Sequence, residues 1–209
     1  MDSNDKLFRY GAFTKNRVET FSDGVFAIIV TLLILEIKVP HLASADSAQQ
    51  LLDAIITLTP KLLSWVISFF TICIIWMNHH RLFEMFNGIN VGLFWLNTHV
   101  LLWVCFVPFP TAVMGDYPRN PLAVALYGLV MGFAGIAFVL TRIYCLKNKS
   151  LLKETVSLAI YKKGIAYSFL LGPVAYFLGA ALAWINTYLS FVVYLLIAIY
   201  FVFSFATKK

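Results

Sequence analysis

Six apolar segments alternate with polar connections along this chain, and each is predicted to be a membrane helix. A short apolar stretch at 51–58 cannot span, and it fits either an interfacial helix or an extension of the second span. The predicted spans are 18–37, 62–78, 89–107, 122–142, 165–185 and 188–206. The pattern predicts an all-α integral membrane protein with one six-helix domain over residues 1–209.

The first span differs from the others because its uncharged part is short. No charge occurs between Asp23 and Glu36, so the uncharged helix reaches about 18 Å, against roughly 30 Å of hydrocarbon. At about 100° per residue, Asp23 points away from a narrow, mostly apolar stripe, and Ser22 lies on a flank. The stripe comprises Arg17, Phe21, Gly24, Ile28, Thr31, Leu32 and Leu35. We expect this helix inside a bundle, against protein or water; an interfacial helix start is the alternative.

Local signals predict how the helices begin, bend and pack. Asn16 is the expected N-cap of the first span. The PFPT sequence from Pro108 should break or kink the end of the third span, and Gly172–Pro173 should kink the fifth. Gly128 and Gly132 predict close helix packing of the fourth span. The sixth span is aromatic and apolar nearly throughout, so we expect it to face lipid.

The charge distribution refines this topology. Only 12% of the residues are charged, about half the proportion of a globular protein, and the net charge is +6. The basic residues cluster beside the apolar spans, so topology and lipid headgroups explain them, and we expect no nucleic-acid partner. With the N-terminus in the cytoplasm, thirteen of the sixteen Lys and Arg lie inside, and only Lys38, Lys61 and Arg119 lie outside. The positive-inside rule therefore predicts a multi-pass protein with both termini in the cytoplasm.

Candidate catalytic groups are few. His79 and His80 end the second span, but adjacent helical residues point about 100° apart, and the H-x-x-x-H spacing of a zinc site is absent. The sequence contains no GxSxG, P-loop or dinucleotide motif. Cys73, Cys105 and Cys145 lack metal-ligand or disulfide spacing. We therefore expect no enzymatic activity, no metal site and no cofactor.

A channel or transporter fits the first span better. A closed cyclic oligomer would place copies of Ile28 and Leu35 around an axis, where apolar rings can gate by dewetting. A ring of Thr31 hydroxyls would offer oxygens to a partly dehydrated cation. The alternative is that these residues are core positions at helical spacing. The TVGYG potassium filter does not occur in the sequence.

Residues 17–23, RVETFSD, resemble the RxxxFSD signature of the transmembrane protein 175 family of potassium channels. The similarity extends to Trp76, Asn78 and His79, and more loosely to Asn97 and the PFPT sequence. Six spans in 209 residues resemble the prokaryotic single-repeat members, which assemble as homotetramers. The resemblance implies a potassium channel of the bacterial inner membrane, with the first helix lining a central pore and no re-entrant loop.

Carried over by position, the resemblance implies roles for individual residues. Ile28 and Leu35 would form hydrophobic constriction rings, Thr31 a hydroxyl layer tied to potassium preference, and Leu32 would also face the path. Ala27 lacks the hydroxyl that some relatives carry there, so the degree of selectivity can differ. A structural role, bonding the first helix to its neighbours, is implied for Arg17, Phe21, Ser22, Asp23, Trp76, Asn78 and His79.

Three functional hypotheses follow, in decreasing order of support. The first is a tetrameric, potassium-selective leak channel. The second is a proton-coupled transporter that uses the intramembrane Asp23 and His79. The third is a membrane-embedded hydrolase that uses the histidines. Potassium ions and the lipid bilayer are the expected partners of the first.

Overall fold

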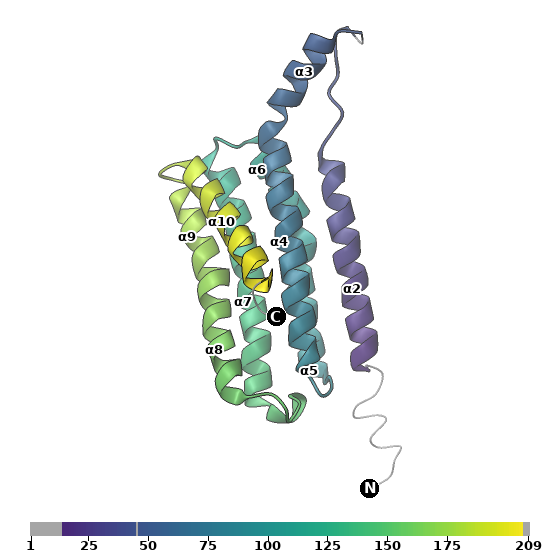
Figure 1. The fold of residues 1–209 in the computed structure, drawn as a ribbon, viewed down its shortest axis with the longest axis vertical. Helices are drawn as coiled ribbons and strands as arrows, with labels where there is room; N and C mark the ends of the chain where they lie inside the picture. The colour runs from purple at the N-terminus through teal and green to yellow at the C-terminus, as the bar shows by residue number, and fades with distance from the viewer. Residues whose placement is uncertain (1–13, 45, 207–209) are drawn as a thin grey trace.

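The computed structural model describes residues 14–44 and 46–206, which form one bundle of helices (Figure 1). Within these residues, six helices are long and apolar enough to cross a membrane, as predicted. They are Lys15–Glu36, Thr59–Glu84, Val91–Asp116, Pro121–Lys147, Leu158–Leu182 and Thr187–Ser204. The boundary that shifts most is the end of the third span, which continues to Asp116.

The first span is helix α2 (Lys15–Leu32), followed by a 3₁₀ turn over Leu33–Glu36. Its N-cap is Thr14, whose hydroxyl accepts a hydrogen bond from the backbone N–H of Arg17 at 3.4 Å. The expected N-cap at Asn16 is therefore wrong. Thr14 caps the helix instead because its backbone is extended and its side-chain oxygen accepts from the first turn. The helix therefore begins two residues earlier than a cap at Asn16 would allow.

The short apolar stretch after the first loop forms a helix of its own. Helix α3 (Ala48–Thr57) is capped by the Ser47 hydroxyl and has no buried side chain. It projects beyond the bundle, and α4 (Thr59–Glu84) begins immediately after it (Figure 1).

Proline interrupts two spans, as predicted. Helix α5 (Val91–Phe106) ends before Pro108, and α6 (Pro108–Asp116) continues the same span because Val107 keeps helical dihedral angles. In the fifth span, α8 and α9 are joined by a π-helical segment that contains Pro173. The bounds of these three elements are Leu158–Phe169, Leu170–Val174 and Ala175–Leu182.

Helix α7 (Pro121–Lys147) packs closely against the fifth and sixth spans. A side-chain carbon at Gly128 would collide with the Tyr194 side chain, and one at Gly132 would collide with a phenylalanine ring of α9. The predicted close packing is therefore used inside one chain. Helix α10 (Thr187–Ala206) was expected to face lipid, which is wrong for one of its faces. Tyr194 is wholly buried there, and its hydroxyl donates to the carbonyl of Val124 at 3.1 Å.

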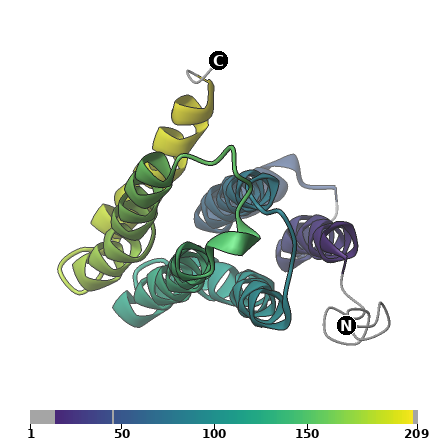
Figure 2. The same cartoon turned by 90° about the horizontal axis from the view of Figure 1, so that it is seen from below.

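Helix α2 lies at the edge of the bundle, where it contacts α4 and α5 (Figure 2). At the end where α4 and α7 terminate, two connections pair with each other. Phe86 and Leu152 form an antiparallel bridge, and the N–H of Lys153 donates to the Met85 carbonyl at 2.9 Å. These contacts tie the turn after α4 to the segment that precedes α8.

Candidate functional site

One face of α2 is buried in the bundle, and the neighbouring face is uncovered. The buried side chains are Val18, Ser22, Phe26 and Ile29, with Leu33 in the following turn. The predicted apolar stripe is exposed in the single chain. Its members include Phe21 at 60% exposure, Ile28 at 58%, Leu32 at 45% and Leu35 at 58%. The stripe therefore lies on the side of α2 that faces away from the chain's own core.

Thr31 lies in the exposed stripe, one turn after Ile28. Its hydroxyl donates within the helix, to the carbonyl of Ile28 at 2.8 Å or to that of Ala27 at 3.1 Å. Because the proton is directed at the backbone, the lone pairs of the oxygen face outward. The hydroxyl is thus oriented as an acceptor on the surface of α2.

A buried hydrogen-bond network holds the other face of α2. Ser22 donates to the Val18 carbonyl at 2.8 Å and accepts from the side-chain amide of Asn97 on α5 at 3.0 Å. The amide oxygen of Asn97 lies 2.7 Å from Nε2 of His79 on α4. Because that oxygen accepts, Nε2 of the imidazole carries a proton. Three helices are joined through one asparagine.

The imidazole of His79 is enclosed by aromatic rings. It stacks on Phe83, with ring centroids 4.2 Å apart, and its centroid lies 5.4 Å from that of Phe26. The side chain is 2% exposed. His79 therefore contacts α2 through Asn97, which bonds Ser22, and the imidazole ring is shielded from water.

A second, less buried contact joins α2 and α4. The indole N–H of Trp76 donates to Asp23 at 2.8 Å, and the Trp76 ring stacks on His80. His80 in turn lies 3.7 Å from the carboxylate of Glu19 on α2. Together with the buried network, this contact fixes the rotation of α2 about its own axis.

Trp76→Phe should remove the bond to Asp23 and keep the aromatic ring. Because both groups are partly exposed, we expect a loss of about 0.5–1 kcal/mol in the free energy of unfolding, measured by thermal melts followed by circular dichroism. Trp184→Phe, which changes an exposed tryptophan at the far end of the bundle, is the control. Equal stability of the two variants would contradict an energetic role for this bond.

The remaining predicted residues lie apart from this network. The Arg17 side chain is exposed at the start of α2. Asn78 lines a cavity between α4, α7 and α8, and no hydrogen bond joins it to the network in the part of the chain that the structure describes. Asn97 was absent from the predicted set of site residues. Its polarity at membrane depth was the sequence signal that could have included it.

The described residues contain no group of three His, Cys, Asp or Glu that could hold a metal ion. The geometry instead offers an exposed apolar stripe with one hydroxyl, on a helix whose opposite side is locked in place. Such a stripe suits contact with other copies of the chain or with lipid.

Comparison with known proteins decides the family. The profile of the family described as "Endosomal/lysosomal potassium channel TMEM175" matches residues 17–108. A potassium channel of Chryseobacterium sp. is 37% identical over 188 residues, which cover 82% of this chain and 93% of the relative. This chain belongs to the TMEM175 family.

The structural comparison agrees with the TMEM175 assignment. The crystal structure of a lysosomal potassium-selective TMEM175 homolog from Chamaesiphon minutus matches with a TM-score of 0.79 at 33% identity, over 91% of this chain and 97% of that one. A more distant relative, the endosomal/lysosomal proton channel TMEM175 of Gallus gallus, is 28% identical over 91% of this chain. This chain spans 38% of that relative's length. TMEM175 proteins are membrane-embedded channels, which places this chain in a membrane.

Proposed function

We propose that four copies of this chain form a potassium-selective leak channel, with the exposed stripe of α2 lining a shared axis. The channel would act in the bacterial inner membrane with both termini in the cytoplasm, and it would have no enzymatic activity. The relatives named potassium channels support the cation. The observation that carries the proposal is the exposed stripe on a helix whose rotation is fixed by buried polar contacts.

The fixed rotation of α2 about its axis matters because a pore-lining helix must present the same face in every subunit. The bonds of Ser22 and Asp23 hold one side of α2, so Ile28 and Leu35 project from the other. Ile28 and Leu35 are seven residues apart, about 12 Å along the axis, because the last three of these residues lie in the 3₁₀ turn. In a closed ring of subunits they would form two successive apolar constrictions that exclude bulk water.

The proton-coupled carrier draws less support from the geometry. Its two proposed groups are engaged in contacts between helices, since Asp23 accepts from Trp76 and His79 is sealed between aromatic rings. A carrier would need a titratable group that is free to exchange protons with an aqueous path, whereas His79 is buried and the partly exposed Asp23 is held by the Trp76 indole. We therefore assign both residues to positioning α2.

Liposome flux tests this choice directly. Purified protein is reconstituted with internal potassium, and proton influx through an ionophore is followed by dye quenching under potassium and then sodium gradients. We expect flux under the potassium gradient that exceeds the sodium flux, and native mass spectrometry should show four chains. Absence of flux under every cation gradient, or saturable uptake driven only by a pH gradient, would contradict the channel.

Thr31→Val tests the hydroxyl layer. Valine keeps the branched shape and removes the outward-facing oxygen, so we expect the potassium-to-sodium permeability ratio to fall about threefold or more while flux persists. The ratio is read from reversal potentials under bi-ionic conditions in planar bilayers. Thr31→Ser, which keeps the hydroxyl, is the matched control. A valine variant as selective as the serine variant would remove Thr31 from the selectivity mechanism.

A further inference from the structure

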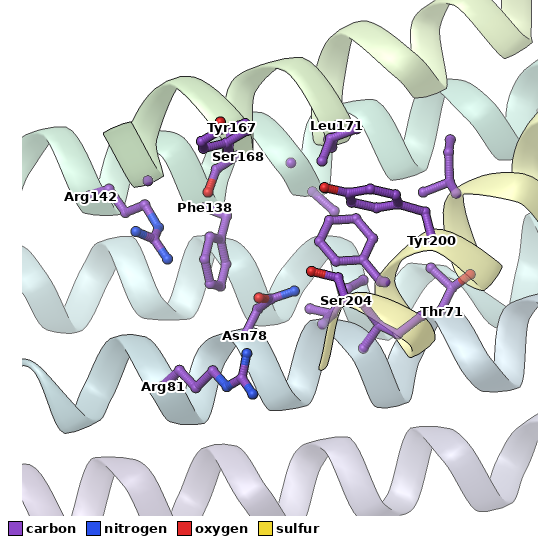
Figure 3. A pocket seen from close by; sticks show the side chains of 18 of the residues that line it. Thr71, Asn78, Arg81, Phe138, Arg142, Tyr167, Ser168, Leu171, Tyr200 and Ser204 are labelled. Carbon is purple, nitrogen blue, oxygen red and sulfur yellow. The ribbon is translucent and has the colours of Figure 1, made fainter. Parts of the chain in front are cut away.

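A cavity of about 820 Å³ lies between α4, α7, α8 and α10, and none of its lining residues belongs to α2 (Figure 3). Its volume falls in the range of ligand sites in proteins, about 300–1,000 Å³. Because α2 does not line it, the cavity is separate from the proposed ion path.

The cavity is polar at one end and apolar at the other. Arg81 lies three residues before the end of α4 at Glu84, and Arg142 lies five residues before the end of α7 at Lys147. In Figure 3 the two arginines lie on opposite walls, with Asn78 and Ser168 nearby. Deeper in the bundle the lining is largely apolar, and it includes Ile74, Met131, Ala134, Ile197 and Phe201.

Arg142 is a buried cation for which the described residues provide no ion pair with an aspartate or glutamate. The residue is 8% exposed, and within the part of the chain that the structure describes its buried Nε has no hydrogen-bond partner. The guanidinium lies 5.5 Å from the ring centroid of Phe138 and 5.8 Å from that of Tyr161. Among the described residues that line the cavity there is no aspartate or glutamate. A buried cation in a membrane span is costly alone, so this wall of the cavity favours an anion.

Phosphate is the anion that suits this arrangement best. The planar guanidinium of arginine donates two parallel hydrogen bonds to phosphate oxygens, which accept well in a low-dielectric site. Arg81 on the facing helix adds a second positive charge to the same cavity. The hydroxyl of Ser168 and the amide of Asn78 are further polar groups beside the arginines.

The shape of the cavity indicates a ligand with an apolar tail. The polar end of the cavity is lined by Met85 and residues 155–157. The bond from the Lys153 N–H to the Met85 carbonyl holds these two segments together. Tyr167 on α8 and Tyr200 on α10 line the cavity and are 62% and 49% exposed. Because these exposed lining residues belong to the fifth and sixth membrane spans, the cavity is open on the side of α8 and α10. Arg81 and Arg142 lie within about two turns of the ends of α4 and α7, and the ends of membrane spans are where lipid headgroups are expected.

We propose that this cavity binds one anionic phospholipid, with its phosphate between Arg142 and Arg81 and an acyl chain along the apolar wall. The charge complementarity and the lateral opening carry the inference together. The proposal concerns binding alone, so it stands or falls independently of ion conduction.

Native mass spectrometry of the full-length protein in neutral detergent tests the charge. Phosphatidylglycerol and phosphatidylcholine are titrated separately, and we expect the anionic lipid to bind at least tenfold more tightly. Arg142→Gln should remove that preference, whereas Lys147→Gln should keep it, because Lys147 lies at the same end of α7 but outside the cavity. Equal binding of the two lipids by the wild type, or equal effects of the two substitutions, would overturn the proposal.

A second variant avoids the buried arginine. Ser168→Trp would fill the cavity from α8 and should weaken phosphatidylglycerol binding at least tenfold, whereas Phe169→Trp should not, since Phe169 is exposed and outside the lining. Competition with inorganic phosphate separates a lipid from a free anion. Retention of the lipid in millimolar phosphate supports the proposal, and displacement at that concentration overturns it, as would equal binding by the two tryptophan variants.

Discussion

Ile28→Asn is expected to raise potassium flux about tenfold or more and to reduce the preference for potassium over sodium. Ile28 is 58% exposed on α2, and a ring of four would exclude water from the proposed path. Asparagine amides would hold water there and lower the cost of passing a hydrated cation. A tenfold rise corresponds to about 1.4 kcal/mol of barrier. That change is smaller than the roughly 1.5–3 kcal/mol associated with burying one such side chain.

The liposome assay measures this increase, with protein amounts matched by native mass spectrometry. Leu196→Asn on α10 is the control, because Leu196 is similarly exposed at 56% but lies on another helix. A leak caused by any asparagine at an exposed apolar position would appear in both variants. If Ile28→Asn left flux at the wild-type level, Ile28 would not form a constriction.

Asn97→Leu is expected to lower the free energy of unfolding by roughly 1–3 kcal/mol. Leucine keeps the branched four-atom side-chain skeleton of asparagine but leaves the buried Nε2–H of His79 without an acceptor and removes the bond to Ser22. Interhelical hydrogen bonds in membranes are modest individually, and this residue makes two. Thermal melts of the purified protein followed by circular dichroism provide the measurement.

Thr98→Val is the matched control for Asn97→Leu, because the Thr98 hydroxyl donates within its own helix, to the Phe94 carbonyl. The double variant with His79→Leu should cost less than the sum of the single variants, since the orphaned donor is gone. Equal melting temperatures for Asn97→Leu and Thr98→Val would show that the network does not stabilise the bundle.

The orientation of α2 shows how far sequence reasoning reached. The 3.6-residue period selected Ile28, Thr31 and Leu35 as one stripe, and the structure leaves those residues exposed. The same period could not identify which residue would bond Ser22. Asn97 lies 75 positions away on another helix, so only the packing of α5 against α2 brings them together.

Two further features depended on tertiary contacts. The resemblance grouped Asn78 with Trp76 and His79, yet Asn78 lines the cavity on another side of α4. The sequence predicted that the sixth span faces lipid on all sides, whereas Tyr194 of α10 packs against Gly128 and Gly179. A helix that is apolar all round carries no signal in its sequence for the face that will be buried.

By itself, the sequence determined the membrane class, the six spans, the proline interruptions and the membership of the apolar stripe of α2. These depend on local hydropathy, helical period and backbone chemistry, which act within a few turns of one helix. The tertiary structure alone decided the network through Asn97, the buried face of α10 and the cavity that joins Arg81 to Arg142. Each of these joins residues on different helices, so it depends on the packing angles and rotations of helices that hydropathy leaves unspecified.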